Sequence, residues 1–187
     1  MKKLGIVFVL CVLTACSWRS PNSFFYVMNS DNLAAISDKK ISVSVTKVKV
    51  PDMLNKAQMV VNDKDSSQIQ VLEFERWGEV YPDILQGTIT NDLIAYLPNA
   101  YVKRTYFDDE NTTYSVSVEV NKLEAYKGDK VILSAWWNIR DAKGNTTAKK
   151  QSVYEAPVHG SDIQNLVDAQ AMAVHKLSQD IALSLAK

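Results

Sequence analysis

The chain has 187 residues and carries 21 lysines and arginines against 21 aspartates and glutamates. This length allows one domain with a sizeable core, and the balanced charge excludes the strongly basic surface of a nucleic-acid-binding protein. The two cysteines, Cys11 and Cys16, both lie near the N-terminus. The rest of the chain therefore cannot form a disulfide, a thiolate metal site or a cysteine nucleophile.

The N-terminal segment has the pattern of a lipoprotein signal peptide. Two lysines precede an apolar run at residues 4–13, which is too short for a membrane-spanning helix, and small residues then lead to Cys16. We expect cleavage after residue 15 and acylation of Cys16 on its sulfur and its amine. Three acyl chains would hold the protein on a bilayer almost permanently. The alternative is a soluble secreted protein with an incidental cysteine.

Cleavage divides the chain into a signal peptide (1–15), a lipidated tether (16–23) and one globular domain (24–187). Because residues 1–15 contain two lysines and no acid, the mature chain has a formal charge of −2. Ser17 follows the cysteine, where an aspartate would favour retention in the inner membrane, so we expect the periplasmic face of the outer membrane. Trp18 and Arg19 are then either headgroup-layer residues or simple linker residues. Residues 17–23 span at most about 25 Å.

Short strands dominate the first part of the domain. Residues 24–28 form an apolar run, and residues 41–45 alternate between apolar and polar side chains, which predicts a half-buried strand. The alternation slips in phase near Thr46 and Lys47, which predicts a β-bulge. Residues 59–61 and 68–72 flank a polar loop, so we expect a hairpin there.

A long helix is predicted over residues 81–97. Pro82 and Asp83 suit its first turn, and Pro98 follows its end. Its apolar side chains recur every four residues, which predicts one buried face, at Leu85, Ile89, Leu93 and Leu97. A short strand is expected at residues 100–105.

The second half predicts an antiparallel meander and a closing helix. Three alternating stretches, 114–120, 131–139 and 154–158, are separated by turns that contain Gly128 and Gly144. After Gly160, either Ser161 or Asp162 is expected to cap a helix that runs to the C-terminus. The predicted fold class is therefore α+β, with two layers: a mainly antiparallel sheet and two long helices packed on one of its faces.

The sequence predicts no enzyme, no metal and no cofactor. It contains no glycine-rich phosphate loop and only two histidines. We interpret His175 as a partly exposed helix residue, and residues 159–162 as a loop and helix cap, because neighbours in sequence cannot easily converge on one reacting atom. The acidic run at residues 108–110 lacks the spacing of a calcium loop and is interpreted as a solvated turn.

Several short stretches together resemble the PqiC family, the auxiliary lipoproteins of paraquat-inducible, MCE-type intermembrane transport systems. None is specific alone, but their order and spacing cover nearly the whole mature chain. They are Phe25-Tyr26, Val48-x-Val50-Pro51-Asp52-Met53-Leu54-Asn55-Lys56-x-Gln58-Met59-Val60, Arg76-Trp77-Gly78-Glu79, Trp137-Asn138-Ile139-Arg140-Asp141 with Gly144, and the helical pattern from Ala173 to Ala182. The family often has tyrosine in place of Met53.

The resemblance implies an outer-membrane lipoprotein that docks the periplasmic end of an MCE-protein tube, which conducts phospholipid between the two membranes. It implies an MCE-domain protein as partner and leaves open a homo-oligomeric ring around the tube. It transfers no active site. A competing hypothesis is a carrier that holds a phospholipid between its helices and sheet, and a third is an envelope hydrolase that uses His159.

Five residues are candidates for partner contact. Met53 and Leu54 lie in a predicted turn, where they either enter the core, which we favour, or bind a partner. Arg76 and Trp77 are interpreted first as a structural clamp at the helix start and second as an interface pair. Trp136 and its neighbour Trp137 must face opposite sides of their strand, and the alternation places Trp136 outward, so it is the best candidate.

Overall fold

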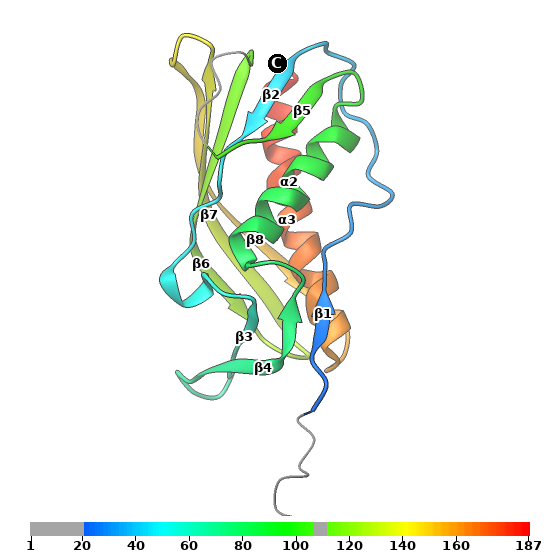
Figure 1. The fold of residues 1–187 in the computed structure, drawn as a ribbon, viewed down its shortest axis with the longest axis vertical. Helices are drawn as coiled ribbons and strands as arrows, with labels where there is room; N and C mark the ends of the chain where they lie inside the picture. Colours follow the sequence, from blue (N-terminus) through cyan, green and yellow to red (C-terminus); the bar gives the residue numbers. More distant parts are fainter. Residues whose placement is uncertain (1–20, 107–111) are drawn as a thin grey trace, which may run out of the picture.

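A computed structural model describes residues 21–106 and 112–187 of the chain (Figure 1). Cys16, Trp18, Arg19 and the acidic run at 108–110 lie outside the described residues. In chain order the elements are β1 (Phe24–Tyr26), β2 (Ser42–Val45), the short 3₁₀ helix η1 (Asp52–Leu54), β3 (Gln58–Asn62), β4 (Ile69–Trp77), α2 (Tyr81–Tyr96), β5 (Tyr101–Arg104), β6 (Tyr114–Ala125), β7 (Lys130–Asp141), β8 (Thr146–Pro157) and α3 (Ile163–Leu185).

The larger sheet has five strands in the order β5-β2-β6-β7-β8. Its meander, β6 to β8, is antiparallel as predicted, with Val118 opposite Trp137 and Leu133 opposite Tyr154. The side chains alternate along each of these strands between a buried and a more exposed position. The sheet therefore has one face in the core and one face toward solvent.

β2 is parallel to both of its neighbours, β5 and β6, which the alternation of its side chains did not reveal. The chain between β2 and β5 contains a hairpin and α2, so the connection is long enough for a parallel crossover. Strand direction depends on this connection and not on the local pattern. The mainly antiparallel character of the fold is therefore confirmed, with β2 as a parallel strand between β5 and β6.

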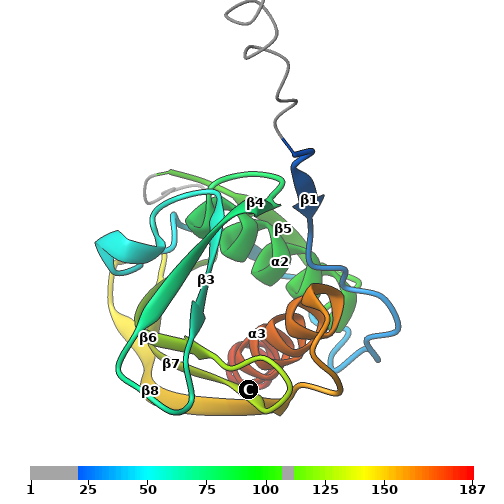
Figure 2. The ribbon, with the colours of Figure 1, turned by 90° about the horizontal axis from the view of Figure 1, so that it is seen from below.

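The predicted hairpin is part of a second, smaller sheet with the order β1-β4-β3. β3 and β4 are antiparallel, and β1 lies parallel to β4 with Tyr26 opposite Trp77. Seen from below, β3 and β4 lie across the near end of the molecule, with α3 visible beside them (Figure 2). The single predicted sheet is thus divided into two, because β1 and the hairpin pair with each other.

Both helices lie on the inner face of the larger sheet, and the α+β class is confirmed (Figure 2). The predicted stripe of α2 is fully buried, as are the central residues of α3 and the inward residues of the meander: Leu85, Ile89, Leu93, Leu97, Leu166, Leu177, Ile181, Leu133 and Ile139. α3 begins after Asp162, one of the two predicted caps, whose side chain makes no capping hydrogen bond. None of the described helices is long and apolar enough to cross a bilayer.

Candidate functional site

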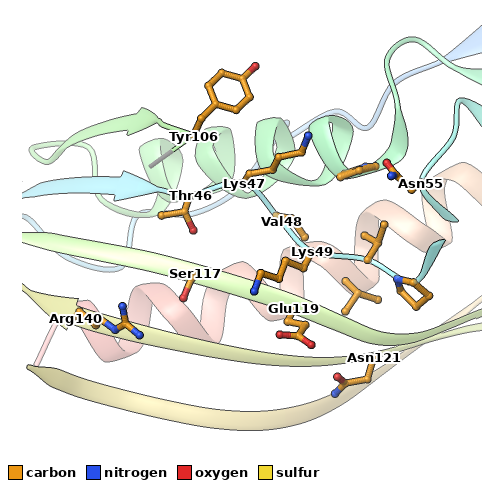
Figure 3. Close-up of a pocket in the computed structure, with 14 residues that line it drawn as sticks. Thr46, Lys47, Val48, Lys49, Asn55, Tyr106, Ser117, Glu119, Asn121 and Arg140 are labelled. Atoms are coloured by element: carbon orange, nitrogen blue, oxygen red, sulfur yellow. The ribbon is translucent and has the colours of Figure 1, made fainter. Parts of the chain in front are cut away.

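The outer face of β6 and β7 carries an extensive hollow, which we call the outer groove. One wall is β6, where Ser117, Glu119 and Asn121 point outward because they alternate with the buried Val118 and Val120 (Figure 3). Ser117 Oγ and Asn138 Oδ1 are 2.9 Å apart across the strands. This face of the sheet is therefore polar, as expected for its solvent side.

The second wall is residues 46–51, which follow β2. The Thr46 N–H donates to Val116 O (2.9 Å), and the Lys49 N–H donates to Val118 O (3.0 Å). Between these bonds Val48 is buried in the core, 2% exposed, and Lys47 lines the groove. The predicted irregularity is thus located correctly, but it is not a simple bulge: β2 ends at Val45, and the chain rejoins β6 through an isolated bridge between Lys49 and Glu119.

A buried glutamine positions the start of this wall. Gln86 of α2 donates from Nε2 to Val45 O (2.9 Å) and to Thr105 O (2.8 Å). These two carbonyls lie at the ends of the neighbouring strands β2 and β5. Because the amide satisfies both of them inside the core, it holds the chain at the point where it leaves the sheet.

The groove has a volume of about 900 Å³ and continues over β7 toward Trp136. Among the residues that the structure describes, the two connected parts are lined by four cationic side chains and one carboxylate: Lys47, Lys49, Arg140, Lys149 and Glu119. The site therefore attracts anionic groups, whether acidic side chains or phosphates. It is open along its length, so it suits an extended or protruding ligand rather than an enclosed one.

Trp136 is the aromatic residue of this surface. Its side chain is 41% exposed, whereas that of Trp137 is 3% exposed in the core, so the predicted orientation of the pair is confirmed. The Lys149 Nζ lies over the indole, 5.7 Å from the ring centre. An exposed tryptophan beside cations is the kind of residue that supplies binding energy at protein interfaces.

The Met53–Leu54 pair is divided between core and surface. Leu54 of η1 is buried, and Met53 is 47% exposed. η1 follows directly after Pro51, which lines the outer groove. The core position favoured for this pair is therefore correct for Leu54 and wrong for Met53, which stays exposed at the end of the groove wall.

Trp77 packs against the start of α2, whereas Arg76 bonds within its own strand. Trp77 is buried with its ring centre 5.3 Å from that of Tyr81, and its backbone N–H donates to Ala57 O (2.7 Å). The Tyr81 hydroxyl donates to Gln170 Oε1 (2.9 Å), and burial raises the pKa of Tyr81 well above its usual value. The Arg76 guanidinium donates to the backbone carbonyl of Glu73 (2.8 Å) and to Glu73 Oε1 (2.7 Å).

The histidines form no recognisable active site with serine. His159, Ser161 and Asp162 are all exposed at the start of α3. His175 instead pairs with the buried Asp92. Among residues 21–106 and 112–187, no three His, Cys, Asp or Glu side chains group together as metal ligands would.

Sequence reasoning found Trp136 but missed the cations around it. The only feature of the sequence that could have indicated these cations is their place at outward positions of alternating strands. Many surface lysines share this feature. Lys49 lines the site because its segment pairs with β6, about 70 residues away in the sequence. That pairing follows from the fold and cannot be derived from local periodicity.

Comparisons with known proteins agree with this fold. A sequence model of the family described as "ABC-type transport auxiliary lipoprotein component" matches residues 28–182. A crystal structure of an uncharacterized protein superposes with a TM-score of 0.72 at 18% identity, covering 88% of this chain and 99% of that one. A crystal structure of a protein from Xanthomonas campestris gives a TM-score of 0.67 at 11% identity, covering 85% and 92%. At these identities the likeness shows the fold alone. No curated protein sequence matches significantly.

Proposed function

Because the chain belongs to the family of ABC-type transport auxiliary lipoprotein components, we propose that it is the outer-membrane lipoprotein of an MCE-type phospholipid transport system. In this role it is anchored through Cys16 on the periplasmic side and docks the MCE-domain protein. The sequence resemblance to the PqiC family supports this system, and the family's transport role supports a non-catalytic protein. The observation that carries the docking role is the outer groove with Trp136.

The groove has the chemistry of a docking surface. It offers an exposed indole, several cations and the nearby Met53 on a rigid sheet. Cations steer an acidic partner to the surface, and an aromatic and a thioether side chain then provide apolar contact. We therefore assign the groove to an acidic surface of the MCE-domain protein.

The packed interior favours docking over the carrier hypothesis. A phospholipid held between helices and sheet needs an apolar cavity there. The side chains at this interface, Leu93, Leu133, Leu177 and Ile181, are all buried against one another. A stoichiometric phospholipid in mass spectra of the purified protein would instead support a carrier.

Self-association is a further part of the proposal. β8 is an edge of the larger sheet and is 12 residues long, with Val153 61% exposed on it. Long open edges allow strand-to-strand contact between copies. Light scattering of the detergent-solubilised lipoprotein would measure the oligomeric state, and a strict monomer at all concentrations would contradict the ring.

Site-specific photocrosslinking in cells tests the docking surface. A photoreactive amino acid at Trp136 is expected to capture an MCE-domain protein, identified by mass spectrometry. The matched control is Leu183 on α3, which is 47% exposed and lies on the helical side of the molecule. Capture of no MCE protein from either position would contradict the proposed partner, and equal capture would contradict the assigned surface.

The anchor has its own test. Changing Cys16→Ala removes the acylation site and is expected to move the protein out of the outer-membrane fraction. The lipidated chain should float with outer-membrane vesicles, and metabolic labelling with palmitate should depend on Cys16. A folded, unacylated wild-type protein in the periplasmic fluid would contradict the proposal.

A further inference from the structure

Large apolar side chains are exposed at the end of the molecule that carries β1 and the β3–β4 hairpin, and we call this set the apolar patch. We define it by six large side chains, each between 38% and 66% exposed: Phe24, Phe25, Val27, Ile69, Val71 and Phe74. Single exposed apolar residues are normal, but a cluster of this kind marks a contact surface. The outer groove lies elsewhere, on β6 and β7, so the patch is a separate feature.

The small sheet explains why these side chains are exposed. The middle of β3 is buried in the core through Met59, Val60 and Val61, whereas β1 and most of β4 are exposed. Val71 is therefore exposed although it pairs with the buried Val60. Phe24 and Phe25 follow each other in β1, so they point to opposite faces of the small sheet, and both are exposed. No further element covers the outer side of this end within the described chain, where β3 and β4 lie across the near end of the molecule in the view from below (Figure 2).

The position of the patch along the chain indicates its occupant. β1 begins at Phe24, eight residues after Cys16, and the described chain enters the molecule at this same end (Figure 1). Eight extended residues span at most about 28 Å, so an acylated Cys16 keeps β1 close to the bilayer surface. The apolar end thus faces the membrane that holds the protein.

We propose that this patch is a membrane-contact surface that enters the interfacial layer of the outer membrane's inner leaflet beside the lipid anchor. The inference rests on the proposed lipidation of Cys16. Aromatic side chains favour the layer between headgroups and acyl chains, where their rings are out of water. The anchor holds the patch next to the bilayer, which gives the patch a high effective concentration at the membrane surface. Even a weak contact between patch and bilayer therefore forms on nearly every molecule.

The contact has a mechanical consequence for docking. An anchor attached by a tether alone lets the domain rotate freely relative to the bilayer. A second contact through Phe25 and Phe74 removes most of that rotation. The outer groove then has a fixed orientation relative to the membrane. A docking surface for a tube that spans the periplasm requires such an orientation.

A single-cysteine probe can test the contact on the lipidated protein itself. Once Cys16 is acylated and residues 1–15 are removed, an introduced cysteine is the only thiol. Phe25→Cys and Phe74→Cys carry an environment-sensitive fluorophore, and Leu183→Cys on α3 is the matched exposed control. Each protein is reconstituted in phosphatidylethanolamine and phosphatidylglycerol vesicles with and without brominated acyl chains, and circular dichroism checks its fold.

We expect brominated lipid to quench the probes at positions 25 and 74 and to leave position 183 unchanged. The double variant Phe24→Ser with Val71→Ser should reduce quenching at position 74. Flotation of the protein without quenching at either patch position would overturn the membrane contact and leave the anchor intact. A probe that becomes shielded with rising protein density, but is not quenched by lipid, would assign the patch to a second copy and overturn the proposal. A lipidated protein that does not float would overturn both this inference and the proposed function.

Discussion

The imidazole Nδ1 of His175 lies 2.8 Å from Oδ2 of Asp92, across the contact between α3 and α2. Asp92 is fully buried, and the side chain of His175 is 19% exposed. The partly exposed position predicted for His175 is therefore correct, but its neighbour was not foreseen. The pair is one of the polar links between the two helices, beside that of Tyr81 and Gln170, and such a link costs stability when only one member is removed.

We predict that His175→Ala lowers the free energy of unfolding by about 2–4 kcal/mol, because it leaves the Asp92 carboxylate buried without this partner. Urea unfolding followed by circular dichroism would measure the change. Met172→Ala, on the exposed side of the same helix, is the control and should change stability by less than about 0.5 kcal/mol. Equal effects from the two variants would mean that the pair does not stabilise the helix contact.

A second prediction concerns the charge of the outer groove. Reversing Lys49→Glu and Lys149→Glu should slow association with an acidic partner and make it less sensitive to salt, since the cations act through long-range attraction. Association rates at several salt concentrations would show this.

Trp136→Ala should instead speed dissociation, because an aromatic contact acts after encounter. Stability should be unchanged by all three substitutions, which lie on the outer face.

A third prediction concerns alkaline pH. The Tyr154 hydroxyl donates to Asp180 Oδ2 (2.9 Å), and burial, with the nearby Asp180 carboxylate, raises the pKa of Tyr154 to about 12. Since the folded-state pKa lies above the unfolded value of about 10, the stabilisation is complete below pH 10 and is lost as pH rises toward 12. Urea midpoints should fall over this window.

The control for that window is Tyr154→Phe. It should cost about 0.5–1.5 kcal/mol at neutral pH through the lost hydrogen bond and should make the alkaline decline shallower. The decline should not vanish, because burial and Glu75 also raise the pKa of Tyr26 to about 12. An unchanged slope in the variant would show that Tyr154 does not contribute to the alkaline transition.

A fourth prediction uses two glycines with opposite roles. Gly144 closes the β7–β8 turn with φ +80°, a conformation that an L side chain rarely adopts, so Gly144→Ala should destabilise by about 1–2 kcal/mol. Gly87 lies inside α2, where an added Cβ would meet only the flexible end of Arg104 at 3.4 Å. Gly87→Ala should stabilise by up to about 1 kcal/mol. Thermal unfolding would compare the two, and the same sign for both would contradict this assignment.

Local pattern determined much of this protein. Apolar spacing located α2, α3, β6 and β7, because a buried face must repeat with the period of its own element. It found only the end of β8, since the first eight residues of that strand are largely exposed. The same period of two distinguished Trp136 from Trp137. The signal-peptide pattern before Cys16 likewise depends only on neighbouring residues.

Only the tertiary structure decided which segments meet. It placed β2 parallel to β5 and β6, separated β1 and the hairpin into their own sheet, and brought Lys49 beside Glu119. It also joined His175 to Asp92, which are 83 residues apart in the chain. Residue spacing records which face of an element is buried, whereas pairing between distant elements depends on how all the buried faces are covered at once.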